Sequence, residues 1–478
     1  MNIDTLMIGD GGLLSLSSSG GPATVTIANA YAPGTGSLVI QANITVVFSG
    51  MVDPTGAASI TASGSGIARF AGDADLDGAS LTTSGTAQAI FGGANVNVGG
   101  ASITHTSSNP LTFDTSVNNA NIAVTGGDEL DGLDIATSTQ AARLVTFDLL
   151  DADSVVFGGS GGGATITGAA NIISLEVDAG ITATFGGLAS FFDLLDLDAT
   201  ATVVNTGGIR LDARGATVVD VIGGNRLAGT VTVEVDGTNN ANLDQLTCAS
   251  FVVNGATSTV TVTGAVDLTA GLTKSGTSIL TMSNTLVVDV GMTVNAGTVS
   301  VANAGDVDGA LNLAGGTTTF SQTLIANSIS GTGGNLTVTT TSTVTTTLSM
   351  NSGTFLFTGA ADIGGNITVS GGSFTLGDGA TLAGATINFT GATAIDIGNV
   401  TFDRGAAQDV TLDTGADFTG TVLVSDGTAV TLHPPAAVTF PAAVTIGQAG
   451  GSADGSLNVN EDVVFTGLVT VNAGAGLS

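Results

Sequence analysis

Short runs of alternating apolar and polar residues recur along the chain at a nearly constant spacing. Six similar ten-residue blocks follow one another in steps of 18 to 20 residues, beginning at Met292, Leu311, Ile329, Leu348, Ile367 and Ile387. Each block reads as a short strand, a turn of small residues and a second short strand. A period near 20 residues, with no helical pattern between the strands, predicts a β-solenoid.

The N-terminal half repeats in a slightly longer register, which aromatic residues mark. Phe48, Phe70, Phe91 and Phe113 follow one another at intervals of 22, 21 and 22 residues. If one coil lies on the next, these side chains stack, and we expect an internal aromatic ladder. The alternative is an exposed stacking platform for sugar rings.

A third pattern, an apolar residue followed by Asp-Ala or Asn-Ala, predicts bends between strands, because Asp and Asn tolerate turn geometry. It begins at Leu150, Val177, Leu197, Val294 and Val471. The acidic segment 128–200 interrupts the repeat, and there we expect loops or a short helix. Its run LASFFDLLDLDA, residues 188–199, is consistent with either an amphipathic helix or a loop that leaves the coil.

Composition supports an all-β fold. The 478 residues include 72 Gly, no Trp and a predominance of small and β-branched apolar residues, which suit closely stacked strands. We therefore predict one continuous, elongated parallel β-helix over residues 1–478, with about 18–22 residues per coil, roughly 23 coils and a less regular part at 1–37.

The formal net charge of −32 excludes some partners. Seven Lys and Arg residues stand against 39 Asp and Glu residues, so a nucleic acid backbone or an anionic membrane surface would be repelled. No apolar run approaches the ~18 residues of a membrane-spanning helix, and we expect no membrane insertion. The single cysteine, Cys248, lies in an apolar strand-like run and is expected to be buried.

Enzymes that cut acidic polysaccharides also use parallel β-helices, and they need acids and bases on neighbouring coils. Here the two histidines, His105 and His433, are far apart in sequence. Arg210 and Arg214 form the one close basic pair, which we interpret as solvated charges beside acidic neighbours. No nucleophile elbow, phosphate loop or zinc motif is present. We therefore predict no enzymatic activity and no required cofactor.

One acidic run resembles a calcium loop. In GDADLDG, Asp73, Asp75 and Asp77 occupy the first, third and fifth positions of an EF-hand-type loop, but Ser84 stands where the bidentate Glu belongs. The three carboxylates are candidate Ca²⁺ ligands if the segment is a bend. If it is a regular strand, they line one exposed face and repel one another.

Blocks such as ITVSGGSFTL, from Ile367, and LNLAGGTTTF, from Leu311, resemble the repetitive β-solenoid stalks of bacterial surface proteins of the filamentous-haemagglutinin and autotransporter-passenger type. The resemblance extends over most of residues 38–478 and implies display at the cell surface and attachment.

The sequence closes in mid-repeat on GLVTVNAGAGLS, without Lys or Pro to protect a strand edge. Either the chain continues in a longer precursor or its tip docks on another copy. We therefore expect a non-enzymatic extracellular structural protein, a subunit of a surface filament, sheath or surface layer that self-associates end to end. The alternatives are a surface adhesin that binds a glycan or receptor and a polysaccharide lyase or hydrolase.

Overall fold

The computed structural model is an all-β protein whose parallel strands stack into a β-solenoid of about 22 turns, which confirms the predicted fold class. It describes residues 1–29, 31, 34–53, 57–213, 218–235, 239–391, 394–412, 416–434, 437–448, 455–472 and 474–478. Contacts divide the chain into two compact units, Met1–Thr232 and Val233–Ser478. The prediction of one continuous solenoid over 1–478 stays a prediction.

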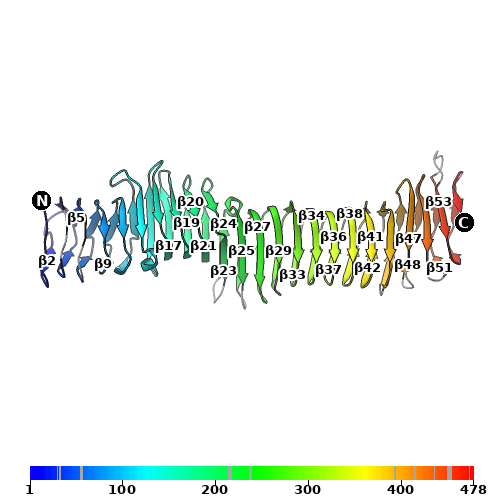
Figure 1. Ribbon diagram of the computed structural model, residues 1–478, viewed down its shortest axis with the longest axis horizontal. Coiled ribbons are helices and arrows are strands. Elements are labelled where there is room, and N and C mark those ends of the chain that lie inside the picture. Colours follow the sequence, from blue (N-terminus) through cyan, green and yellow to red (C-terminus); the bar gives the residue numbers. More distant parts are fainter. Residues whose placement is uncertain are drawn as a thin grey trace. The chain divides into compact units, whose positions relative to one another are not determined.

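Unit 1, residues 1–232, has three faces of parallel strands, which run side by side from blue to green in Figure 1. The first face contains β1 (Asn2–Ile3), β3 (Ala23–Ile27), β5 (Ile44–Phe48), β7 (Ile67–Phe70), β10 (Gln88–Phe91), β13 (Leu111–Asp114), β15 (Asp134–Thr139) and β24 (Val219–Ile222). Between β15 and β24 this face is continued by the C-terminal parts of three long strands that turn a corner, β17 (Leu150–Gly159), β19 (Ala170–Val177) and β21 (Ala189–Leu197). Their N-terminal parts pair on another face, which continues with β23 (Ile209–Ala213). The second contains β2 (Leu13–Leu16), β4 (Ser37–Ile40), β6 (Ser59–Ala62), β9 (Ser80–Gly85) and β12 (Ser102–Ser107).

The third face of unit 1 contains β8 (Ala74–Asp75), β11 (Asn95–Asn97), β14 (Ile122–Thr125), β16 (Leu144–Phe147), β18 (Gly163–Ile166), β20 (Thr182–Phe185) and β22 (Thr202–Asn205). Two single-turn 3-10 helices, η1 (Gly127–Leu130) and η2 (Gly224–Arg226), interrupt the strands. Strand β25 (Thr230–Val235) contains the point at which the two units divide.

Unit 2, residues 233–478, repeats this arrangement, from green to red in Figure 1. One face contains β26 (Asn240–Leu243), β28 (Thr259–Val262), β30 (Ile279–Met282), β33 (Thr298–Val301), β35 (Thr317–Phe320), β37 (Asn335–Val338), β39 (Thr354–Phe357), β42 (Ser373–Leu376), β45 (Ala394–Ile397) and β48 (Ala416–Phe418). β51 (Val438–Phe440) pairs with β54 (Val463–Phe465).

The other two faces of unit 2 meet at a corner, which five long strands turn without a break: β27 (Leu246–Gly255), β29 (Val266–Lys274), β34 (Gly305–Leu313), β36 (Leu324–Gly331) and β38 (Ser342–Met350). In the remaining coils each face has its own strand. One face has β31 (Leu286–Val288), β40 (Ala361–Ile363), β43 (Ala380–Leu382), β46 (Val400–Phe402), β49 (Val422–Val424), β52 (Val444–Ile446) and β55 (Val469–Val471). The other has β32 (Gly291–Val294), β41 (Asn366–Val369), β44 (Thr386–Phe389), β47 (Ala407–Thr411), β50 (Ala429–His433), β53 (Ser456–Val459) and β56 (Gly476–Leu477).

The register of unit 2 is the one that the repeat predicts. Each first residue of the six aligned blocks pairs with the next, from Met292 with Leu311 to Ile367 with Ile387. Strand side chains alternate between the two sides of the sheet, so apolar residues at every second position fill the interior of each coil. The repeating sequence thus sets both the pairing and the core.

The predicted aromatic ladder is confirmed. Phe48, Phe70, Phe91 and Phe113 are paired in register on successive coils and are fully buried. Their ring centroids lie 5.0, 4.7 and 5.4 Å apart, each pair stacked. The alternative of an exposed stacking platform is therefore wrong. Cys248 is also buried, as expected, and is not in a disulfide.

Segment 128–200 is more regular than the sequence analysis predicts. Residues 189–197, expected as a helix or a loop, form strand β21, in which Phe191, Leu195 and Leu197 point into the core. Pairing with β19 and β23 outweighs the helix-like spacing of these residues. The bend predicted at Leu150 is also wrong, because Leu150 begins strand β17, whereas strands β19 and β21 do end at Val177 and Leu197.

Candidate functional site

The structure brings two of the three predicted calcium ligands into one hydrogen-bonded row. Asp73 and Asp75 are half-buried on the outer side of the coil that contains β8, and Asp77 is exposed in the turn that follows. Asn95, on the next coil, donates from its backbone N–H and its Nδ2 to the Asp73 carboxylate, at 3.0 and 2.9 Å. Asn97 Nδ2 donates to Asp75 Oδ1 at 2.9 Å.

This row continues for one more coil. Asn97 Oδ1 accepts a hydrogen bond from Thr125 Oγ1 at 3.1 Å, and the row lines a depression of about 190 Å³. In the part of the chain that the structure describes, no three His, Cys, Asp or Glu side chains are grouped so as to hold a metal ion. Amide donors occupy carboxylate oxygens that a cation would need, so the fit to Ca²⁺ is poor. Calcium binding stays a prediction.

The histidines and the basic pair have structural partners. His105 lies against Thr83 Oγ1 through Nδ1 and against the Asn109 carbonyl oxygen through Nε2. His433 Nδ1 lies 2.8 Å from Asn460 Nδ2. Arg210 forms an ion pair of 3.1 Å with the buried Asp212. Arg214 lies outside the described residues.

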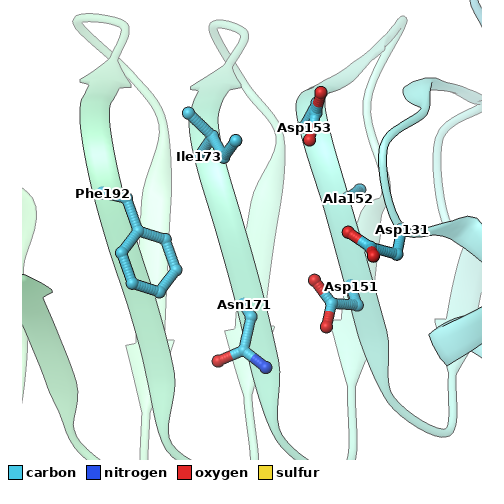
Figure 2. Close-up of a pocket in the computed structure, with 7 residues that line it drawn as sticks. All are labelled: Asp131, Asp151, Ala152, Asp153, Asn171, Ile173 and Phe192. Carbon is cyan, nitrogen blue, oxygen red and sulfur yellow. The ribbon is translucent and has the colours of Figure 1, made fainter.

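A second candidate site is a groove of about 550 Å³ on the outer surface of unit 1 (Figure 2). Its walls are formed by residues of three successive coils and by Asp131, which follows η1; these residues are Asp131, Asp151, Ala152, Asp153, Asn171, Ile173 and Phe192. Figure 2 shows β17, β19 and β21 side by side, with Asp131 reaching in beside β17. The groove thus has an acidic half and an apolar half.

Strand register and a β-bulge place these side chains. Asp151 of β17 is paired with Asn171 of β19, so the two polar side chains are neighbours on the outer face. Between β19 and β21 the register shifts, and two residues, Phe192 and Asp193, stand opposite Ile173. A bulge of this kind re-aims a side chain. Phe191, which precedes the shift and is paired with the buried Ile172, points into the core, and by alternation its neighbour Phe192 lines the groove opposite Ile173.

In the acidic half of the groove, neighbouring carboxylates repel one another, and a hydrogen bond from Asn171 offsets only part of this repulsion. Burial, followed by the negative charges of Asp131, Asp128 and Asp153, raises the pKa of Asp151, although a side-chain hydrogen bond with Asn171 acts in the opposite direction. Among the described residues, no Lys or Arg forms an ion pair with Asp131, Asp151 or Asp153. The groove therefore favours a ligand that donates hydrogen bonds or carries positive charge.

The sequence analysis marked segment 128–200 as irregular but did not find the groove. The available signal was the adjacent pair Phe191 and Phe192 inside an otherwise alternating strand, since alternation allows only one of two neighbours to face the core.

The fold defines the class: this chain is a β-solenoid protein. Comparison with protein-family models, with curated proteins and with solved structures finds no match. No helix within the described residues is long and apolar enough to cross a membrane.

Proposed function

We propose that the chain is a non-enzymatic structural protein of the cell surface, a subunit of an extracellular filament, sheath or surface layer that associates end to end with further copies. The observation that carries the proposal is the parallel stacking of coil upon coil within each unit, a geometry that a further copy of the chain can extend. Among the described residues, β1 and β2 pair with β3 and β4 alone, and β55 and β56 pair with β52 and β53 alone. Unpaired backbone groups on such edges are templates for another strand.

Apolar side chains are exposed at the same coils. Met7 and Leu13 are 76% and 70% exposed in unit 1, and Leu468 is 73% exposed in unit 2. On β2 the inward-facing Leu14 and Leu16 are half-buried, whereas their partners Leu38 and Ile40 on the next coil are fully buried. A further coil stacked on this edge would bury Leu14 and Leu16, and burial of apolar surface would add to the backbone pairing. A second copy of the chain offers an edge of the same kind.

Sedimentation velocity and electron microscopy of the full chain at about 0.15 M salt test this proposal, because salt at that level screens the repulsion between acidic copies. We expect particles that lengthen with protein concentration. Leu13→Lys and Leu468→Lys should each weaken association about tenfold or more, since a desolvated charge opposes stacking. Val290→Lys is the matched control, because Val290 is 65% exposed but lies between strands β31 and β32. Monomers at every concentration and salt level would refute end-to-end assembly.

A surface adhesin is the second candidate, and the groove of unit 1 is the observation that favours it. The residues that line it lie within segment 128–200, which the sequence analysis marked as irregular. Attachment and assembly would then occupy different parts of the chain, so a variant altered in the groove should still assemble. The narrower resemblance to filamentous-haemagglutinin and autotransporter-passenger proteins belongs to this proposal as well.

The lyase or hydrolase alternative has less support. An acidic polysaccharide would meet Asp131, Asp151 and Asp153 in the groove, and like charges repel. Incubation with acidic polysaccharides in the presence of Ca²⁺, followed by detection of new reducing ends or unsaturated products, tests this alternative directly.

A further inference from the structure

We propose that the groove of unit 1 binds a saccharide chain that carries free amino groups, with the sugar rings on Ile173 and Phe192 and the amines at Asp131, Asp151 and Asp153. The proposal rests on the adhesin candidate and names its ligand class. Three features of the groove support it: its size, its division into an acidic and an apolar half, and the negative charge of three Asp residues that form no ion pair with Lys or Arg among the described residues.

The size of the groove suits an oligosaccharide. Its volume of about 550 Å³ is within the range of small-molecule sites. It extends over strands β17, β19 and β21, and neighbouring strands lie about 4.8 Å apart, so the distance from the first to the third strand is about 10 Å. About two hexose rings, laid along the direction in which the coils stack, cover that distance.

The apolar half is suited to the carbon-bound face of a sugar ring. Ile173 is 42% exposed, whereas its neighbour Ile172 is fully buried. Phe192, which stands opposite Ile173, lines the same wall. Burial of these two side chains against the C–H groups of a pyranose is favourable, and an aromatic face also attracts an adjacent ammonium group.

The acidic half is suited to amines and hydroxyl groups. Three carboxylates and the Asn171 amide project hydrogen-bond acceptors into the groove (Figure 2). Mutual repulsion among these carboxylates contributes to the raised pKa of Asp151. A bound ammonium group would reduce that repulsion and form charge-assisted hydrogen bonds. An acidic saccharide would increase the repulsion.

A saccharide fits better than a basic peptide. Peptides that bind to sheets usually add a strand to a free edge, where backbone groups are unpaired. Strands β17, β19 and β21 each have partner strands on both sides, so none of them offers a free edge. The groove therefore offers its side chains and no open strand edge, and hydroxyl and amino groups distributed around a sugar ring match that arrangement.

Isothermal titration of the full chain at about 50 mM salt tests the proposal, because low ionic strength preserves the charge effect. The probes are a β-1,4-linked glucosamine oligomer, its fully N-acetylated counterpart, an oligogalacturonate and an oligolysine of equal charge. We expect the glucosamine oligomer to bind, the N-acetylated one to bind about tenfold or more weakly, and the oligogalacturonate not to bind. Oligolysine should bind more weakly than the glucosamine oligomer.

Variants tie any binding to the groove. The double variant Asp151→Asn with Asp153→Asn should lower affinity for the glucosamine oligomer about tenfold or more, because it removes two charges without changing side-chain shape. Phe192→Leu should lower it less. The double variant Asp267→Asn with Asp362→Asn, which changes two exposed carboxylates on β29 and β40 of unit 2, is the control for net charge. Circular dichroism confirms that each variant is folded.

Three results would overturn the proposal: no binding of the glucosamine oligomer, unchanged binding in the double variant, or equal or tighter binding of oligolysine, which would assign the groove to a basic peptide. Sedimentation of the same proteins at about 0.15 M salt, the condition of the assembly test, keeps the two functions separate. If the protein assembles but does not bind the glucosamine oligomer, the saccharide proposal alone is wrong. If it binds the oligomer but does not assemble, the proposal of end-to-end assembly alone is wrong.

Discussion

At the scale of single residues, the least expected feature is a lysine inside the coil. Lys274 ends strand β29 with its side chain fully buried, and its Nζ donates to the carbonyl oxygens of Ser275 and Gly276, at 2.8 and 2.9 Å. Burial disfavours the charged form and lowers the pKa of Lys274 to about 8. The ammonium group is therefore retained at neutral pH at a cost in stability.

This cost predicts a dependence on pH. Between about pH 8 and pH 10 the unfolded chain keeps the Lys274 proton and the folded chain does not, so the free energy of unfolding should rise with pH. We expect urea denaturation at pH 7.5 and pH 10 to show a rise in the wild type that exceeds the rise in Lys274→Met by about 2–3 kcal/mol. Equal pH dependence in the two proteins would contradict the assignment to Lys274.

The aromatic ladder provides a second prediction at this scale. Phe70 is stacked between Phe48 and Phe91 and is fully buried. Phe70→Ala should lower the free energy of unfolding by about 3–5 kcal/mol, because it removes a large side chain and leaves a cavity. Phe70→Leu, which keeps most of the volume, should cost about 1–2 kcal/mol. Urea denaturation measures both, and equal costs would show that the core closes around the gap.

At the scale of a coil, close backbone approach explains why particular glycines are required. A Cβ atom on Gly50 would overlap the carbonyl oxygen of Asn29 on the preceding coil, whereas a Cβ on Gly21 would meet nothing within 4 Å. Neither glycine has a positive φ angle, so the pair isolates the effect of contact between coils. The two positions are in the same unit.

We expect Gly50→Ala to lower the free energy of unfolding by about 1–3 kcal/mol, because the coils must separate locally to admit the methyl group. Gly21→Ala should be neutral or raise it by about 0.5 kcal/mol, since it restricts the unfolded chain. Thermal unfolding followed by circular dichroism compares the two variants. A similar loss in both would mean that contact between coils is not the cause.

The same scale shows what the sequence could and could not predict. The aligned blocks from Met292 to Ile387 predicted which strands pair and in which register. Stacked coils repeat one hydrophobic pattern, and a shift of the register by one residue would turn the apolar side chains toward solvent. Residues 188–199 were misread, since Phe, Leu and Asp spaced three and four apart also fit a helix. The groove was not predictable, because it needs β17, β19 and β21 in register together with a bulge.

At the scale of the whole molecule, the net charge of −32 opposes folding and association alike. Compact coils bury carboxylates and bring them closer together than an unfolded chain does; burial, and after it the charges of neighbouring carboxylates, raises the pKa values of Asp151, Glu176 and Asp306. We expect the free energy of unfolding to rise on the order of 1 kcal/mol when NaCl increases from about 10 to 150 mM, because salt screens this repulsion. Stability that fell with added NaCl would contradict this account.

A comparison of Ca²⁺ with Mg²⁺ distinguishes general screening of the protein's charge from specific binding of Ca²⁺. Asp73 and Asp75 already accept hydrogen bonds from Asn95 and Asn97, so a Ca²⁺ ion at Asp73, Asp75 and Asp77 would have to displace those amide donors. We therefore expect CaCl₂ and MgCl₂ of equal ionic strength to stabilise the protein equally, since screening depends on ion charge and concentration. Thermal unfolding measures the difference. Extra stabilisation by Ca²⁺ that Asp75→Asn abolishes and Asp362→Asn retains would instead establish the calcium site, because a ligand of the folded state stabilises it by mass action.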